Sequence, residues 1–160
     1  MKNPIVMIVG LVVSQNLMAA SIGSILLSGT VAVVNEVVIT ANGSHNTSLN
    51  ITGGESGKNI ASVLETSNNP EGYVITLCSD NAGELRHSND SSQKTTYSVS
   101  YDGGSYQAPP ACSNALEVKS VSSMSGLGSD TSQILVNVTA FPLAPAGSYS
   151  DSLTISIAAN

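Results

Sequence analysis

The apolar residues of this chain stand in short runs bounded by turn-forming residues, and this spacing limits its fold more than any other feature. The run from Tyr73 to Cys78 is the clearest, since it follows the turn cluster 68–72 and is almost wholly apolar or β-branched. Such runs, rich in Val, Ile, Thr and Tyr, are typical of strands. Charged residues make up 10% of the chain, against about 25% in average soluble domains, so strong helix formers are scarce. We therefore predict an all-β protein.

Eight or nine short runs at intervals of roughly 8–12 residues predict an antiparallel β-sandwich. Tyr73, Ile75 and Leu77 should face its core. Polar stretches at 86–94 and 122–132 are predicted to be loops, and no internal repeat or second domain is evident. The predicted strand regions are 25–34, 36–40, 49–51, 60–64, 73–78, 97–101, 116–121, 133–141 and 149–158.

The first twenty residues have the order of a secretory signal peptide. Lys2 precedes the apolar stretch 5–13, and the small residues Ala19 and Ala20 follow a polar patch. A membrane anchor is the alternative, but a spanning helix needs about 20 apolar residues, and this run is interrupted at 14–16. We expect residues 1–20 to be a signal peptide cleaved after Ala20, and the protein to be exported.

Cys78 and Cys112 are the only cysteines. An even count in an exported chain indicates a disulfide, with two free thiols as the alternative. Zinc would need four ligands, and only His45 and His87 could join the cysteines, neither at a short spacing from one. We predict a Cys78–Cys112 disulfide and no metal site.

Charge and residue types exclude several functions. The formal net charge is −6 with five Lys and Arg residues, which cannot neutralise a run of phosphates or an anionic lipid surface. No nucleophile elbow frames His45 or His87, and no close carboxylate pair is suited to acid–base work. We therefore expect neither an enzyme nor a cofactor.

Two motifs resemble a known family. The segment 146–157 resembles the A-G-x-Y-x-D-x-L-x-[IV]-x-[IV] ending of chaperone–usher pilins, especially archaic pilins and spore-coat-U-type domains. The segment 97–102 looks like their Y-x-[VL]-Y-x-D strand, with one residue more between the tyrosines. The resemblance implies an incomplete immunoglobulin-like sandwich whose missing strand comes from the N-terminal extension of the next subunit. It also implies a periplasmic chaperone and an outer-membrane usher as partners, and passage through the periplasm to the cell surface or a fimbrium.

The mature N-terminus has the pattern that such a donor strand needs. One face of residues 21–34 alternates large side chains with a single glycine, and a strand added in trans must alternate in this way. The alternative is the first strand of a complete, monomeric sandwich, with Gly29 at a bulge. Residues 35–160 would form the pilin-like domain in either case. The expected donor face is Ile25, Leu27, Gly29, Val31 and Val33.

The C-terminal strand should direct Tyr149, Leu153, Ile155 and Ile157 to the core.

The first functional hypothesis is an exported structural subunit of a fibre or coat that polymerises by strand exchange with copies of itself or related subunits. The second is a self-contained secreted binding module or adhesin for a glycan or protein. In that case Tyr101, Tyr106 and the turn 102–104 would be its contacts.

Overall fold

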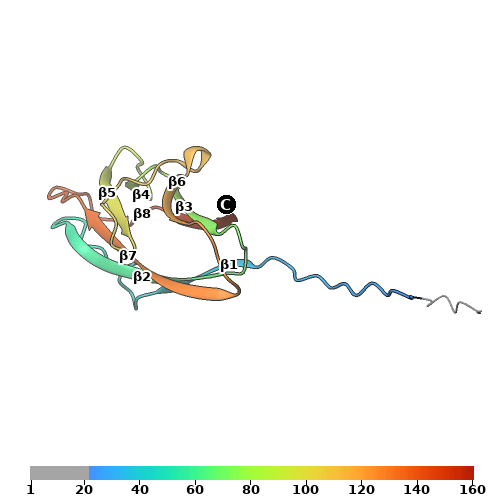
Figure 1. Cartoon of the computed structure of the whole chain (residues 1–160). Coiled ribbons are helices and arrows are strands. Elements are labelled where there is room, and N and C mark those ends of the chain that lie inside the picture. Colours follow the sequence, from blue (N-terminus) through green and yellow to red (C-terminus); the bar gives the residue numbers. More distant parts are fainter. Residues whose placement is uncertain (1–21) are drawn as a thin grey trace, which may run out of the picture. The chain divides into compact units, whose positions relative to one another are not determined.

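The computed structural model describes residues 22–160, so the predicted signal peptide, 1–20, lies outside the described residues. Residues from Ala32 to Asn160 form one compact unit. They contain nine strands and one 3-10 turn (Figure 1). The elements are β1 (Asn35–Ala41), β2 (Glu55–Ser67), β3 (Tyr73–Ser79), β4 (Glu84–His87), β5 (Lys94–Tyr101), η1 (Cys112–Asn114), β6 (Leu116–Val121), β7 (Gly128–Val138), β8 (Tyr149–Ser150) and β9 (Leu153–Ala159).

The strands form an all-β sandwich of two antiparallel sheets, as predicted. The larger sheet has six strands in the order β1-β2-β7-β5-β4-β8, and the smaller has three in the order β6-β3-β9. The longest strand of the larger sheet, β2, pairs with β1 on one side and β7 on the other. The smaller sheet is centred on β3, which pairs with β6 and β9.

Period-2 alternation places the core between the sheets. In β3, Tyr73, Ile75 and Leu77 are buried, as predicted. Tyr97 and Val99 of β5 are also buried. Apolar side chains on one face of a strand leave water together when a second sheet covers them, so these alternating runs determine which faces meet.

Several local expectations were wrong. Residues 84–87 form β4 and bury Leu85 and His87, although 86–94 was expected to be an exposed loop. Strand β7 begins at Gly128, inside the expected Ser/Gly loop. The C-terminal run is divided into β8 and β9 at Asp151, and residues 49–51 lie in a loop. Pairing with strands distant in sequence overrides weak local patterns in each case.

The expected strand at 25–34 is also absent, since the structure assigns no strand between Ile22 and Val34. Its large apolar side chains are exposed, Ile25 and Leu27 by 85% each and Val31 by 88%. An alternating segment is a strand only when a neighbour satisfies its N–H and C=O groups.

A buried carboxylate joins the two sheets. Glu65 of β2 accepts hydrogen bonds from Tyr101 (2.5 Å), Ser132 (2.7 Å) and Tyr73 (2.8 Å), and lies 3.0 Å from Lys119 Nζ on β6. Burial by itself would raise the pKa of Glu65, but hydrogen bonds, the largest from Tyr101, outweigh it and hold the pKa below its usual value. Glu65 is therefore a buried, charged carboxylate, and both of its oxygens accept hydrogen bonds.

Candidate functional site: the groove between β1 and β9

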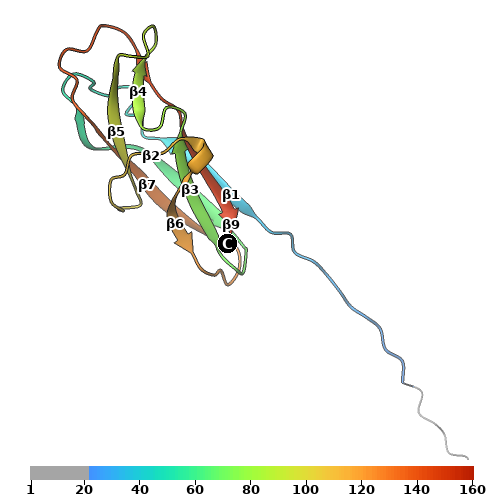
Figure 2. The ribbon, with the colours of Figure 1, turned by 90° about the horizontal axis from the view of Figure 1, so that it is seen from above.

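The two sheets end in unpaired edges that face each other. Within residues 22–160, β1 pairs only with β2 and β9 pairs only with β3. Asn35 at the start of β1 pairs with Ser67, and Ala159 at the end of β9 pairs with Tyr73, so both lie at the β2–β3 turn. Strands β1 and β9 therefore run in opposite directions (Figure 2), each with free backbone groups along one side.

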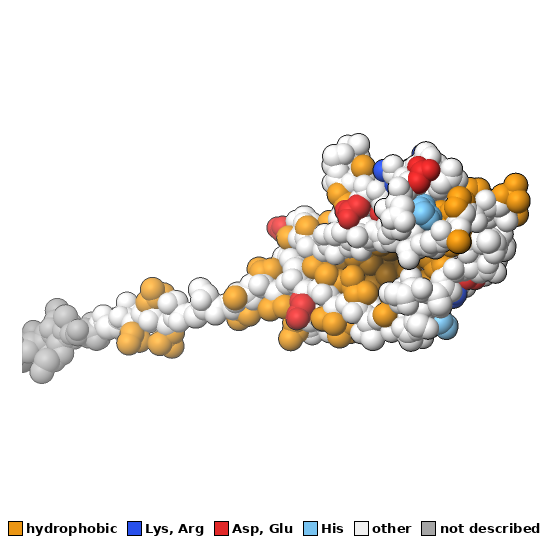
Figure 3. All heavy atoms as spheres, turned by 180° about the vertical axis from the view of Figure 1, so that it is seen from behind, with side chains coloured by type: hydrophobic (Ala, Val, Ile, Leu, Met, Phe, Trp, Pro, Cys, Tyr) orange, Lys and Arg blue, Asp and Glu red, His pale blue; other side chains and the backbone are white. Residues whose placement is uncertain are grey.

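An apolar groove lies between these edges, with a cavity of about 230 Å³. Figure 3 shows hydrophobic side chains gathered in a hollow on this face. The walls come from β1 and β9, and the floor from β2, β7, β4 and β5. The lining residues are Ile39, Ala41, Asn46, Leu49, Ile60, Ala61, Leu85, Tyr97, Ile134, Val136, Val138, Asp151, Leu153 and Ile155.

The far end of the groove is wider and more polar. A second hollow of about 530 Å³ lies between the loop 46–51 and the segment 147–151. Asn46, Leu49, Leu85 and Asp151 line both hollows. The two hollows therefore form one continuous trough, apolar beside β9 and polar beside β8.

Side chains that face the core remain exposed along this trough. Ile155 is buried, but Leu153, Ile157 and Tyr149 are only half-buried, and Ile39 of β1 is 49% exposed. Residues of the same alternation in β3 are buried because they have neighbours on both sides. The core is thus left partly open along the β1–β9 seam.

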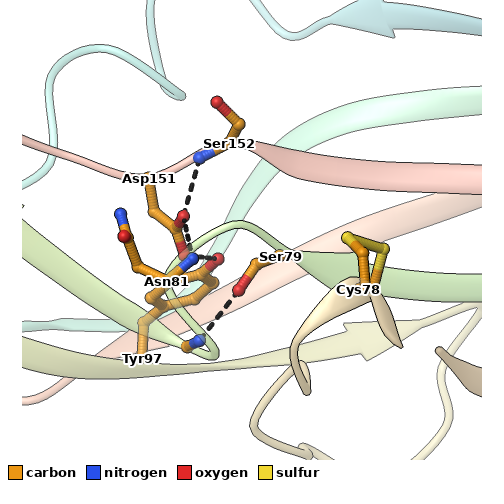
Figure 4. The surroundings of a disulfide bond; sticks show 8 residues. Cys78, Ser79, Asn81, Tyr97, Asp151 and Ser152 are labelled. Carbon is orange, nitrogen blue, oxygen red and sulfur yellow. Dashed lines mark hydrogen bonds between the residues drawn. A yellow bond between two sulfur atoms is a disulfide. The ribbon is translucent and has the colours of Figure 1, made fainter. Parts of the chain in front are cut away.

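Asp151 fixes the polar end of the trough. Its Oδ2 accepts a hydrogen bond from the Tyr97 hydroxyl at 2.9 Å, and its Oδ1 accepts bonds from the backbone N–H groups of Asn81 (2.9 Å) and Ser152 (2.8 Å) (Figure 4). Burial raises the pKa of Tyr97 and outweighs a lowering by Ser79, and the Asp151 carboxylate raises this pKa further. The Tyr97 hydroxyl therefore remains a donor. Asp151 connects β5 and the turn at Asn81 to the segment between β8 and β9.

Gly147 and Tyr149 of the C-terminal motif pack on His87. A Cβ added to Gly147 would lie 2.0 Å from His87 Nε2, and the rings of His87 and Tyr149 meet edge-on with centroids 5.1 Å apart. His87 Nε2 lies 3.2 Å from the carbonyl oxygen of Ala146. The glycine and tyrosine of the motif therefore shape the rim of the trough.

The predicted donor face lies on exposed backbone. Ile25, Leu27 and Val31 are almost fully exposed, Val33 is 61% exposed, and no other group lies within 4 Å of a Cβ placed on Gly29. Within the described residues, nothing covers these side chains.

The predicted disulfide is present between Cys78 and Cys112. It joins the end of β3 to η1, beside the backbone hydrogen bond from Ser79 N–H to Pro110 O at 2.9 Å. Neither cysteine lines the trough. The bond therefore fastens a surface loop to β3, outside the trough.

The two tyrosines expected as contacts of a binding module differ in exposure. Tyr101 is buried and bonded to Glu65, whereas Tyr106 is 40% exposed. His45 is an exposed loop residue whose Nδ1 lies 2.9 Å from the carbonyl oxygen of Asn59. Among residues 22–160 there is no group of three His, Cys, Asp or Glu side chains suited to a metal, and no helix long and apolar enough to cross a membrane.

Two features of the domain escaped sequence analysis. Leu85 lines both hollows, and its two-residue spacing from His87 was the available signal for a short strand. Asn68, at the root of the N-terminal segment, gave no signal, because its role depends on which backbone lies beside it.

In comparisons with known proteins, no family model and no curated protein matches the chain.

Proposed function

We propose that this chain is an exported structural subunit that polymerises into a fimbria-like fibre or surface coat by placing residues 25–33 in the trough of another copy. One observation carries the proposal: a sandwich with two facing unpaired edges, and an apolar seam between them, occurs in the same chain as an exposed alternating segment. An inserted strand would part the two edges where Cα atoms of β1 and β9 lie within 8 Å of each other, pair with them and cover the seam.

The dimensions support this pairing. Nine residues from Ile25 to Val33 span about 30 Å when extended, which is long enough to run along β1 and β9, of seven residues each. One face of the donor offers four large apolar side chains and a glycine. Fully burying each large side chain contributes about 1.5–3 kcal/mol, which must offset the entropy of ordering the segment.

A subunit without a donor would expose the seam and both edges, which are aggregation hazards. The proposal therefore includes a carrier that covers the trough during export, in line with the chaperone and usher that the resemblance implies. It includes no catalytic step and no cofactor.

Deletion of residues 22–33 and peptide complementation test the proposal. The truncated chain should unfold at lower denaturant concentration than polymers of the full chain, and a peptide spanning Ser24 to Val34 should restore its stability and protease resistance. A truncated chain that is as stable as those polymers, and that the peptide does not stabilise, would refute donor-strand exchange and favour the self-contained binding module.

A matched pair of full-length variants tests the donor face. Gly29→Arg should abolish polymers, because the side chain would point into the trough of the next copy. Ser28→Arg lies on the opposite face and should leave polymerisation intact. Detergent-resistant ladders that collapse on boiling give the readout, and equal behaviour of the two variants would contradict the predicted face.

A further inference from the structure

We infer that Asn68 latches the root of the N-terminal segment, so that the segment completes a second copy of the chain and not the domain to which it is attached. The inference rests on the proposed function, because it concerns which trough the donor strand can enter.

Asn68 continues the β1–β2 ladder beyond its last strand pair. After Asn35 and Ser67, the Asn68 N–H donates to Val34 O at 3.2 Å. Its side chain adds two bonds: the Val34 N–H donates to Oδ1 at 2.6 Å, and Nδ2 donates to Ala32 O at 2.8 Å. The side-chain amide thus replaces the next peptide group of β2 and holds the backbone extended from Ala32 to β1.

Chain topology excludes insertion into the same domain antiparallel to β9. A strand in that direction runs parallel to β1. Val33 would then lie at the end of the sandwich opposite the start of β1. The seven residues of β1 span about 20 Å, and the chain must return that distance to reach Asn35. Val34 is the only residue available for the return, and it cannot bridge the gap.

Insertion in the other direction requires a tight hairpin between the segment and β1. The turn would fall on Val33 and Val34, whereas two-residue hairpin turns favour Gly, Asn or Asp at φ above zero. It would also reverse the chain where Asn68 binds Ala32 and Val34, and so break the latch. Asn68 therefore opposes the one route that topology leaves.

Such a latch matters because the segment attached to a domain competes with the segments of other copies for that domain's trough. A short tether gives an effective concentration in the millimolar range, about a thousandfold above a micromolar subunit. Two net hydrogen bonds change an equilibrium constant roughly 30-fold. The Asn68 side chain thus adds to a turn that Val33 and Val34 already disfavour, and shifts the competition toward other copies.

The test compares full-length wild type, Asn68→Ala and Asn42→Ala, with polymers separated from monomers by size-exclusion chromatography at several concentrations. Asn42 is an exposed asparagine whose side chain donates one bond, to Asn59 O at 3.4 Å, so it is a matched control. Hydrogen exchange at residues 25–33 of the monomer reports whether the segment is inserted. We expect an unprotected segment in wild-type and Asn42→Ala monomers, and an up to 30-fold larger protected monomer fraction in Asn68→Ala.

A second variant keeps the test decisive if Asn68→Ala folds poorly. A twelve-residue Gly-Ser linker between Val34 and Asn35 has a mean reach of about 19 Å, enough for the return along β1. It should yield protected monomers at every concentration, whereas a four-residue linker, with a reach of about 11 Å, should still polymerise.

The outcomes separate the two proposals. Protected wild-type monomers, or no change on Asn68→Ala, would overturn the latch while leaving the trough as an acceptor. A segment unprotected in every species, including the long-linker variant, would overturn the proposed function and the latch with it.

Discussion

Replacing Glu65 with glutamine tests how the sandwich is held together opposite its open seam. Four donors surround this carboxylate: Tyr101, Ser132, Tyr73 and Lys119. A glutamine oxygen can accept two bonds, and its NH2 group would face the remaining donors. Lys119 keeps Asp130 (2.7 Å) and Asp102 (3.2 Å) as partners, so the main loss is one buried donor without an acceptor, which costs about 1–3 kcal/mol.

The control is Glu84→Gln on the surface. Glu84 binds Arg86 at 2.8 Å and Lys94 at 2.6 Å, but exposed pairs of this kind are worth no more than about 1 kcal/mol. Urea and thermal unfolding followed by tyrosine fluorescence measure both variants, and the melting temperature of Glu65→Gln should fall by roughly 4–12 °C. Equal losses for the two variants would refute the view that the Glu65 cluster joins the sheets.

The acid dependence has a definite sign. Folding lowers the pKa of Glu65 below its ordinary value of 4.5, so its stabilisation is complete above that value and is lost as pH falls through the folded pKa. Glu65→Gln should remove this part of the acid transition. A wild-type minus variant difference that stays constant from pH 6 to pH 2 would contradict the assignment.

Three further predictions concern the rest of the domain. Cys78→Ser opens a loop with a sequence separation of 34 residues and should cost about 4 kcal/mol in urea unfolding, and the intact chain should resist thiol labelling until a reductant is added. Gly147→Ala forces a Cβ against His87 and should lower the melting temperature, whereas His87→Ala should reduce that penalty in the double variant. Ile155→Asp buries an unpaired carboxylate and should abolish the yield of soluble, folded protein, whereas Thr154→Lys, exposed on the other face of β9, should be tolerated. Equal tolerance at the two positions would show that the register of β9 is wrong.

The sequence alone determined the elements with strong local signals. Strand β3 alternates between turn clusters, and its buried face could be predicted from Tyr73, Ile75 and Leu77. The cysteine count predicted the disulfide, and the scarcity of strong helix formers predicted the all-β class. These inferences succeed because the two-residue period of a strand and the conformational preferences of turn residues act over a few neighbouring residues.

Only the tertiary structure decided which edges remain open and which polar residues are buried. Nothing near Glu65 in the sequence indicates that three hydroxyls and an ammonium group from other strands surround it. The same holds for Asn68, whose side chain acts as a strand partner for Ala32 and Val34. The trough exists because β9 pairs with β3 and β1 pairs with β2. Such pairings join residues far apart in the chain, so their outcome depends on the packing of the whole sandwich and not on any local pattern.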